Sequence, residues 1–325
     1  MAAQIYDRRH DFFCRGVTRF FSACFPIPLL RGADLALLLV AIVWGTSYGV
    51  AKGALAYYPV LGFLAVRFLL TTALLAPVAL RGTTAAQRWG ALRKGLPLGA
   101  LLLSIFVCET YGVAHTPASR AAFLISLCVV FTPVAEWALM GQRPSRAVWM
   151  CVAVSLCGAL LLAGGWQGGW SGGDALMLAA AVLRALMACA TARAARHVSP
   201  SAAPGAAPVP VLLLTTVQSA VVGLGTLAMG WALLPQGLPS LPTWQDASGF
   251  WWATAYLVLG CTVFALVAQN WALKHTSPSR VGLLTGTEPA WGALFAVAWL
   301  GESLGPQGWL GGALVVGAAL WMARR

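Results

Sequence analysis

Five charged residues lie inside long apolar stretches of this sequence, and their types could do chemistry: Arg67, Glu109, Glu136, Arg184 and Glu288. A charged side chain that faces lipid at the centre of a helix costs about 2.5–3.5 kcal/mol. Five such costs exceed what an ordinary fold has to spare, so these side chains must face a cavity, one another or an interface. Held there, they could bind a charged small molecule, and a carboxylate could also carry a proton.

The depth of four of these charges predicts two pairs. At about 1.5 Å per helical residue, Arg67 and Glu109 lie roughly 12 Å and 9 Å from the same end of their stretches. Arg184 and Glu288 each lie about 14–15 Å into theirs, near the middle of a membrane. The Arg67–Glu109 pair fits a structural ion pair and a substrate site equally well. The deeper Arg184–Glu288 pair favours function, and Glu288 is the candidate for carrying a coupling proton.

Aromatic and amide side chains accompany these charges. Aromatic rings can bound a pocket and hold cationic or planar groups, although many of the 15 tryptophans must belong to the interfacial belt instead. Neighbouring amides could line the mouth of the same pocket. The predicted substrate-binding residues are Trp44, Tyr48, Arg67, Glu109, Tyr111, Arg184, Gln269, Asn270, Glu288 and Trp291.

Three further features are interpreted structurally. Glu136 lies near the end of its stretch, within reach of Arg143 or Arg146, and is read as a boundary residue. Pro289 leaves the carbonyl of residue 285 without its usual donor, so the backbone there is expected to open. A small-residue stripe in the first stretch predicts close helix contact; it consists of Gly45, Gly49 and Gly53.

The elements that must position these residues are membrane-spanning helices. Of 325 residues, 59% are hydrophobic and 9% are charged, with a mean hydropathy of +0.78. Soluble domains carry about 25% charged residues, and a span needs roughly 20 apolar ones. The sequence predicts an all-α integral membrane protein with ten spans: 34–52, 59–80, 95–114, 118–140, 147–165, 174–195, 209–234, 248–273, 279–300 and 306–323.

The basic residues predict the orientation of these spans. With both termini inside, 17 Lys and Arg residues lie on the cytoplasmic side and two, Lys52 and Arg120, on the outer side. This division follows the positive-inside rule and explains the net charge of +12 without a nucleic-acid partner. The expected partners are the lipid bilayer of a bacterial inner membrane and a small-molecule substrate. The chain itself could be a monomer or a homodimer.

A nearly repeated hexapeptide indicates an internal duplication. HTPASR at 115–120 returns as HTSPSR at 275–280, and the match continues over about fifty residues without a gap. Five spans separate the copies, so they face opposite sides of the membrane. The sequence predicts a five-helix repeat at 34–165, a glycine-rich linker at 166–173 and an inverted five-helix repeat at 174–325. Residues 1–33 are expected to be a cytoplasmic extension that could lie at the membrane interface. Inverted repeats are typical of secondary transporters.

Neither the histidines nor the cysteines indicate catalysis, a metal or a cofactor. His115 and His275 head the two hexapeptides on opposite sides, so they cannot share a ligand, and loop and capping roles are predicted for both motifs. The eight cysteines show no metal-binding spacing. The glycine-rich stretch at 164–173 precedes Asp174 and has no following lysine, which favours a flexible joint over a phosphate loop.

The sequence resembles the EamA-type permeases of the drug/metabolite transporter superfamily. The matching stretches include WGTSYGVAKGAL and FLAVRFLL in the first half, and NWALKHTSPSRVGLL and EPAWGALFAVAWLGESLG in the second. The first half departs from the pattern, with Gln142 where the second half has Glu302. The resemblance implies a carrier that exports or exchanges small metabolites, among them amino acids, nucleotide-related compounds and organic cations.

Two other classes of function remain open at this point. A membrane-embedded enzyme would need a reactive constellation, and the sequence has no H-E-x-x-H motif and no acidic cluster suited to Mg²⁺. A pore or a scaffold protein could share the ten-helix fold. The favoured hypothesis is a secondary transporter that moves amino-acid-like or other small polar or cationic compounds by alternating access.

Overall fold

The computed structural model describes residues 32–116, 118–163, 169–196, 209–234, 237–300 and 305–324. Within these ranges every regular element is a helix, as the sequence predicts. Most of the N-terminal extension and part of the glycine-rich linker lie outside the described residues. The helices are α2 (Gly32–Leu55), α3 (Val60–Leu80), α4 (Ala85–His115), α5 (Ala118–Ser126), α6 (Cys128–Met140), α7 (Arg146–Leu162), α8 (Gly172–Arg196), α9 (Val211–Leu233), α10 (Ser248–Tyr256), the π-helix η1 (Leu257–Phe264), α11 (Ala265–His275), α12 (Pro278–Thr285), α13 (Glu288–Leu300) and α14 (Pro306–Ala323).

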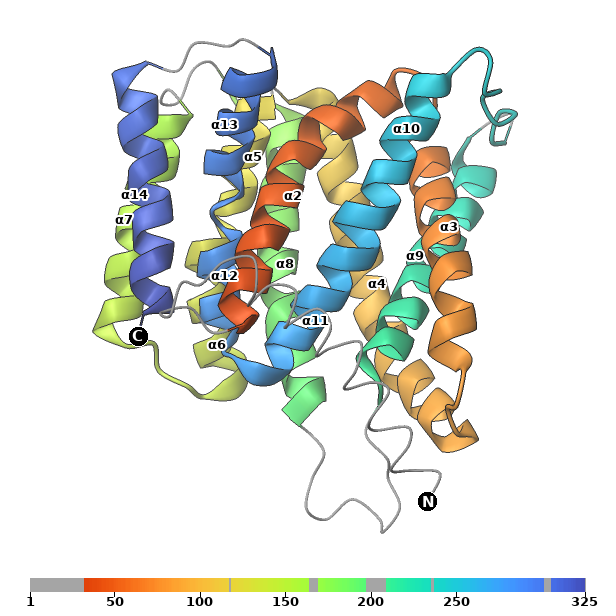
Figure 1. Ribbon diagram of the computed structural model, residues 1–325, viewed down its shortest axis with the longest axis horizontal. Helices are drawn as coiled ribbons and strands as arrows, with labels where there is room; N and C mark the ends of the chain where they lie inside the picture. Colours follow the sequence, from red (N-terminus) through yellow and green to blue (C-terminus); the bar gives the residue numbers. More distant parts are fainter. Residues whose placement is uncertain are drawn as a thin grey trace.

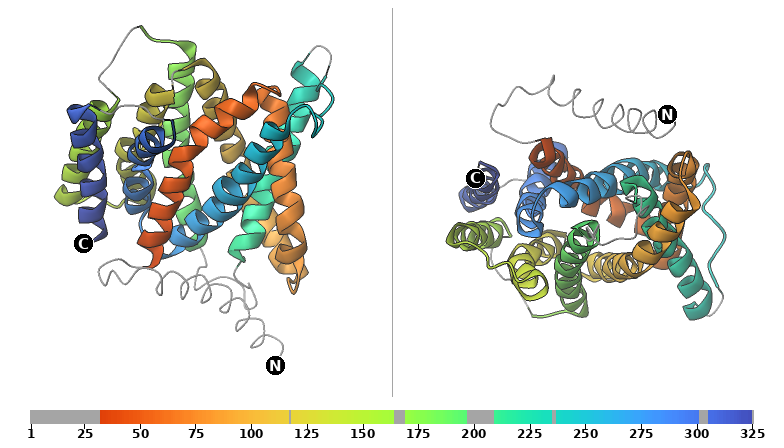
Figure 2. Two further views of the ribbon diagram at one scale, coloured as in Figure 1. Left: turned by 45° about the horizontal axis from the view of Figure 1, so that its top comes forward. Right: turned by 90° about the horizontal axis from the view of Figure 1, so that it is seen from below.

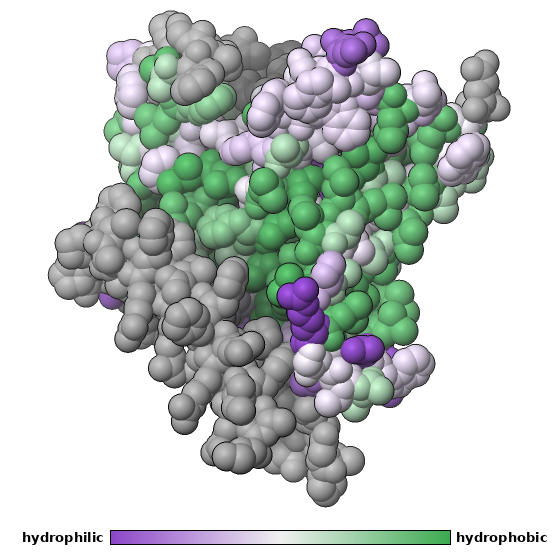
Figure 3. All heavy atoms as spheres, turned by 45° about the vertical axis from the view of Figure 1, so that its right-hand side comes forward, coloured by the Kyte–Doolittle hydropathy of each residue, from purple (hydrophilic) through white to green (hydrophobic). Residues whose placement is uncertain are grey.

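Seven helical segments of the described chain are long and apolar enough to cross a membrane. They are Gly32–Leu55, Val60–Leu80, Ala85–His115, Arg120–Met140, Gly172–Ala194, Val211–Leu233 and Ser248–His275. The other three predicted spans form the shorter α7, the broken pair α12–α13, and α14. An apolar band crosses the face of the molecule shown in Figure 3, between hydrophilic residues at either end. The protein is therefore a multi-pass membrane protein.

The third span begins earlier than predicted. Helix α4 starts at Ala85 instead of residue 95, because a capping box closes its first turn. The Thr84 hydroxyl accepts from the backbone N–H of Gln87, and the Gln87 side chain accepts from the backbone N–H of Thr84. This arrangement satisfies two N–H groups that a helix otherwise leaves unpaired. Hydropathy alone misses the polar first turns of such a helix.

Two of the predicted spans are broken at matching positions. The fourth is helical from Arg120 to Met140 but has an irregular turn at Leu127 between α5 and α6, and the ninth divides at Gly286 and Thr287 into α12 and α13. Leu127 and Thr287 are 160 positions apart, which is the offset between the two hexapeptides. The second break confirms the expected opening beside Pro289, since proline cannot donate to the carbonyl of Thr285.

The bundle is elongated, and its helices contact one another in matched sets (Figures 1 and 2). Helix α7 lies against α14 at one end of the cross-section, and α3 lies against α9 at the other. Between them, α2 contacts α11 and α13, while α8 contacts α4 and α6. The span that opens each half of the sequence therefore lies against two spans of the other half.

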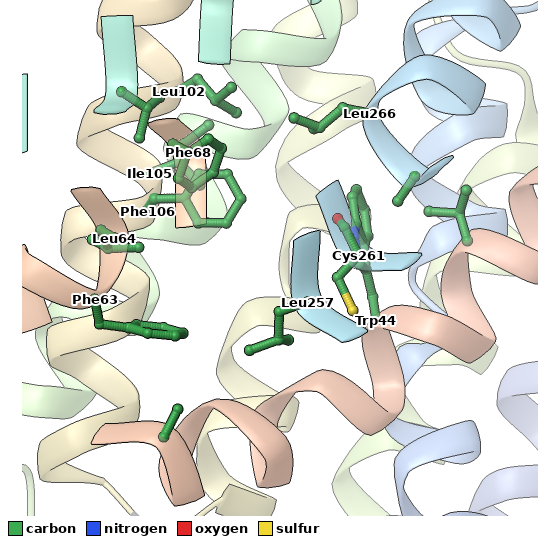
Figure 4. Close-up of a cluster of buried hydrophobic side chains, with 14 of the residues drawn as sticks. Trp44, Phe63, Leu64, Phe68, Leu102, Ile105, Phe106, Leu257, Cys261 and Leu266 are labelled. Atoms are coloured by element: carbon green, nitrogen blue, oxygen red, sulfur yellow. The ribbon is translucent and has the colours of Figure 1, made fainter. Parts of the chain in front are cut away.

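The largest apolar cluster lies on the α3–α9 side of the centre (Figure 4). Phe68 of α3 and Phe106 of α4 meet edge to face with ring centroids 4.6 Å apart. Trp44 of α2 joins this cluster beside Cys261 of η1, and its indole N–H donates to the Cys261 carbonyl at 2.9 Å. Trp44 thus links the apolar cluster to the polar centre of the bundle.

Close contact along the small-residue stripe is confined to its first member. A Cβ atom at Gly45 would stand 2.5 Å from the Glu288 carbonyl oxygen and 2.8 Å from the Gly292 nitrogen. At Gly49 and Gly53 a Cβ atom would meet nothing within 4 Å. The prediction is therefore right for Gly45 and wrong for the other two, which are exposed.

Candidate functional site

Arg184 of α8 joins the side chains of Glu288 and Glu109 at the centre of the bundle. Its Nη1 donates to Oε1 and Oε2 of Glu288 at 2.9 and 3.2 Å. Its Nη2 lies 3.3 Å from Oε2 and 3.5 Å from Oε1 of Glu109. The exposed fractions of the three side chains are 16% for Arg184, 3% for Glu288 and 11% for Glu109. The predicted contact between Arg184 and Glu288 is confirmed.

Two aromatic residues of α2 complete this cluster. The Tyr48 hydroxyl donates to Oε2 of Glu288 at 3.1 Å. The Arg184 guanidinium lies over the Trp44 ring, with its carbon 4.8 Å from the ring centroid. The name Arg184 cluster is used below for Trp44, Tyr48, Glu109, Arg184 and Glu288.

The positive and negative charges of the Arg184 cluster do not balance. Two carboxylates share one guanidinium, so the ionised cluster carries one net negative charge. Glu109 is the less satisfied acid: its Oε2 is buried, and no donor reaches it with hydrogen-bond geometry despite the 3.3 Å contact with Arg184. A buried acceptor without a partner costs free energy. A cationic donor group of a ligand would supply that partner.

A small cavity of about 20 Å³ lies beside the cluster. This volume holds about one water molecule, so a metabolite can enter only when the surrounding helices move apart. Trp44, Arg184 and Gln269 of the predicted site line the cavity. The sequence analysis missed the other polar lining residues, which are Cys128, Thr132 and Thr285.

One sequence signal could have identified Cys128. It lies 160 positions before Glu288, so the duplication assigns the two residues to equivalent places. Cys128 is the first residue of α6 and Glu288 the first residue of α13, each directly after the break in its span. Both residues lie at the central site, one lining the cavity and the other bound to Arg184.

The predicted pair between Arg67 and Glu109 is wrong. Glu109 contacts Arg184 instead, because the carboxylate lies on the side of α4 that faces α8. Arg67 is buried and donates from Nε to the Thr262 hydroxyl of η1 at 2.8 Å. Its guanidinium carbon lies 5.5 Å from the Phe68 ring centroid and 5.2 Å from that of Phe106. Equal depth placed the two charges at one level, but not on facing sides of their helices.

The two predicted amides of the eighth span point in different directions. Gln269 lines the central cavity. Asn270 is buried against α9, where its amide donates to Thr215 at 3.0 Å and to Gln218 at 2.8 Å. Asn270 therefore joins α11 to α9 and lies apart from the Arg184 cluster.

Two predicted aromatic residues make contacts outside the Arg184 cluster. The Tyr111 ring stacks on His115 at the end of α4, with centroids 6.5 Å apart. The Trp291 indole donates to the Thr287 hydroxyl at 3.0 Å, one turn earlier in the chain. Trp291 lies near the break in the ninth span, while Tyr111 lies near a helix end.

The residues interpreted as structural have structural contacts. Nδ1 of His115 bonds to the Tyr111 carbonyl, and Nδ1 of His275 bonds to the Trp271 carbonyl, each at 2.8 Å. Each histidine thus bonds to the last turn of its own helix, which fits the loop and capping roles predicted for the two motifs. Glu136 accepts from the backbone N–H of Ser279 at 3.0 Å and also from its hydroxyl, so it caps the start of α12.

The sequence matches the model of the EamA-like transporter family twice, over residues 31–164 and 171–324. The chain belongs to the EamA-like transporter family. Membership points to a transporter of small molecules and not to an enzyme. The Arg184 cluster of this EamA-family protein takes residues from both matched regions: Trp44, Tyr48 and Glu109 from the first, and Arg184 and Glu288 from the second.

Known proteins resemble this EamA-family chain in part of its sequence or in its fold. An uncharacterized transporter of Archaeoglobus fulgidus is 32% identical over 105 residues, which are 32% of this chain and 32% of the relative. The match therefore spans about a third of that relative's length. A solved structure described as the crystal structure of a protein has a TM-score of 0.68 at 20% identity, covering 88% of this chain and 94% of the other. That likeness concerns the fold alone.

Proposed function

We propose that this EamA-family protein is a secondary transporter that exports small organic compounds across the bacterial inner membrane by alternating access. The observation that carries the proposal is the Arg184 cluster, in which both halves of the chain place charges around one buried point. Such charges inside a membrane protein mark a binding site by default. The adjacent 20 Å³ cavity is too small for a metabolite, so binding requires a change of conformation.

Ten spans in two inverted halves form the framework of this proposal. The breaks at Leu127 and Thr287 and the matched contacts between helices support two equivalent five-helix units. Secondary transporters with such repeats place the substrate between the halves, beside discontinuous helices. The distribution of Lys and Arg supports cytoplasmic termini.

The substrate class follows from the charges of the site. Two carboxylates, one guanidinium and the Trp44 ring suit a compound with an ammonium or other cationic group. The unpartnered Oε2 of Glu109 is the acceptor that such a group would occupy. Amino-acid-like compounds and organic amines fit this description. Glu288 is the candidate for a coupling proton, which predicts that Glu288→Gln loses the pH dependence of net transport but retains exchange.

Thermal shift followed by counterflow tests the proposal. Small amines and amino acids are first screened against the purified protein, and compounds that raise its Tm are then tested in proteoliposomes. Saturable counterflow is expected. Glu109→Gln should lower the counterflow rate by more than it lowers the amount of folded protein. Flux without saturation would indicate a pore. Chemical conversion of the compound would indicate an enzyme, and the absence of both binding and counterflow for all amines would reject the proposed substrate class.

Reporter fusions test the topology separately. Fusions after Gly168 and after Gln236 are expected to read as periplasmic, and a fusion after Arg88 as cytoplasmic. A cytoplasmic signal after Gly168 would contradict the inverted arrangement, because a cytoplasmic N-terminus followed by five spans places Gly168 on the outer side.

A further inference from the structure

Arg120 forms an ion pair at one end of the bundle that the Arg184 cluster does not use. Its Nη1 lies 3.0 Å from Oδ2 of Asp174, which is fully buried at the start of α8. The Thr116 hydroxyl donates to Oδ1 of Asp174 at 3.0 Å, and the Ser171 backbone N–H donates to Oδ2 at 2.9 Å. Arg120 belongs to the first half of the chain and Asp174 to the second.

Arg280 forms the corresponding pair at the opposite end. Its Nε and Nη2 donate to Oδ1 and Oδ2 of Asp34, each at 2.8 Å. Asp34 is 1% exposed near the start of α2, and Nη2 of Arg280 also donates to the Ala323 carbonyl. Here the arginine belongs to the second half and the aspartate to the first.

The duplication relates the two pairs to each other. Arg120 and Arg280 are the last residues of the two hexapeptides, and Asp34 and Asp174 lie in the first turns of the spans that open the two halves. Helix α2 begins at the lower end of the bundle in Figure 1, and α8 begins at the upper end. Each pair therefore joins the two halves across one end of the molecule, and both pairs are present in the same conformation.

We infer that Arg120–Asp174 and Arg280–Asp34 are paired closures that control access to the Arg184 cluster from opposite sides of the membrane. Opening one end requires the halves to separate there, which breaks the ion pair at that end and leaves the other intact. The inference rests on the proposed alternating access, but it concerns residues outside the substrate site. It assigns to the duplicated arginines a role beyond the loop geometry that the sequence predicts.

The two closures differ in strength. Arg280 holds Asp34 through two parallel bonds and is 10% exposed at its side chain, whereas Arg120 contacts Asp174 through one nitrogen and is 17% exposed. Bidentate charge-assisted bonds are the stronger kind. Loss of the Asp34 closure is therefore expected to change the balance of conformations more than loss of the Asp174 closure.

Labelling of Cys128 by a methanethiosulfonate, which forms a mixed disulfide with the thiol and releases methanesulfinate, provides the test, since this thiol lines the central cavity and is 6% exposed. The full-length chain keeps Cys128 and has its other seven cysteines replaced. A positively charged, membrane-impermeant methanethiosulfonate is applied to spheroplasts from outside, or to inverted vesicles from the cytoplasmic side. Asp174→Asn and Asp34→Asn each weaken one closure by removing the charge of the acid, and a charge exchange within each pair provides the rescue.

Each of the two aspartate replacements is expected to raise the labelling rate of Cys128 from one side of the membrane only. Hydrogen bonds to charged groups contribute about 1.5–3 kcal/mol, which corresponds to a roughly 10-fold to 150-fold change in the labelling rate. Asp174→Asn should act from one side, Asp34→Asn from the other and more strongly, and the charge exchanges should restore slow labelling. Asp246→Asn and Arg88→Gln are matched controls, because their bonds to Thr243 and Thr83 stay within one half.

Two results would overturn the inference. Equal increases from both sides would show that the pairs stabilise the fold without controlling access. Unchanged labelling from either side in correctly folded variants would show that the pairs do not close the ends. Labelling needs no substrate, so side-specific increases in a protein without counterflow would support the closures while rejecting the proposed transport.

Discussion

Replacement of Arg184 tests the charge balance of the central cluster most directly. Arg184→Met removes the guanidinium that both Glu109 and Glu288 contact, and leaves two buried carboxylates at one point. Glu288→Gln is a milder change. It leaves Arg184 paired with Glu109, and the amide oxygen can still accept from Arg184 and Tyr48.

The structure predicts different magnitudes for these two changes. Removal of one partner of a buried ion pair costs about 3–5 kcal/mol, and Arg184→Met leaves two acids without their cation, so its loss should reach the upper end of that range. Glu288→Gln keeps the cationic donor Arg184 and exchanges an ionised acceptor for a neutral one, a difference of about 1–2 kcal/mol. Glu109→Gln introduced into Arg184→Met should recover part of the loss, because one of the two unpaired charges disappears.

The free energy of unfolding of purified variants, measured by denaturant titration in mixed micelles, checks this ranking. Arg143→Met is the matched control, since Arg143 is exposed in the loop before α7 and its loss should change stability by less than about 0.5 kcal/mol. Equal losses in Arg184→Met and Glu288→Gln would refute the reasoning. So would additive losses in the double variant, which would indicate that Arg184 does not offset the charge of Glu109.

Three further predictions concern the helices around the cluster. Arg67→Met and Glu109→Gln should show a smaller coupling energy than the cycle above, since these two residues make no direct contact, and the same unfolding titrations measure it. Gly45→Ala should cost about 1–3 kcal/mol by overpacking against α13, whereas Gly49→Ala, with open space around it, should be neutral or stabilising, as judged by Tm. Thr84→Ala should cost about 1 kcal/mol through loss of the capping box and fray the first turn of α4, detectable as faster amide exchange there.

The sequence predicts the helical class, the positions of most helices and one of the two deep ion pairs. Apolar length is a strong signal, because a membrane span must satisfy its backbone hydrogen bonds internally. Depth along a helix follows from counting residues, and this suffices for Arg184 and Glu288, which lie at similar depths on helices that meet at the centre. The gapless duplication also identifies two hexapeptides whose histidines cap the preceding helices in the same way.

The sequence does not predict the facing sides of the helices. Arg67 and Glu109 share a level, but the helix that each one faces depends on the arrangement of the whole bundle. The same uncertainty separates Gln269 from Asn270, since adjacent residues on a helix point in directions about 100° apart. The π-helix of the eighth span adds a further rotation, because its wider turns shift the residues that follow.

The broken spans explain how a net negative charge can be held at the centre of a membrane protein. Glu288 is the first residue of α13, where the positive end of the helix dipole favours a carboxylate. Pro289 has no N–H, and Ala290 and Trp291 donate to the Thr287 carbonyl, so the carboxylate is held by side chains. These are the guanidinium of Arg184 and the hydroxyl of Tyr48. Cys128 occupies the equivalent first position of α6 and supplies a neutral thiol. The duplicated position thus provides two helix starts beside one cavity, and only the second carries an acid. One guanidinium from α8 contacts both Glu288 and Glu109, so the proposed cationic ligand would meet one carboxylate whose charge is not offset.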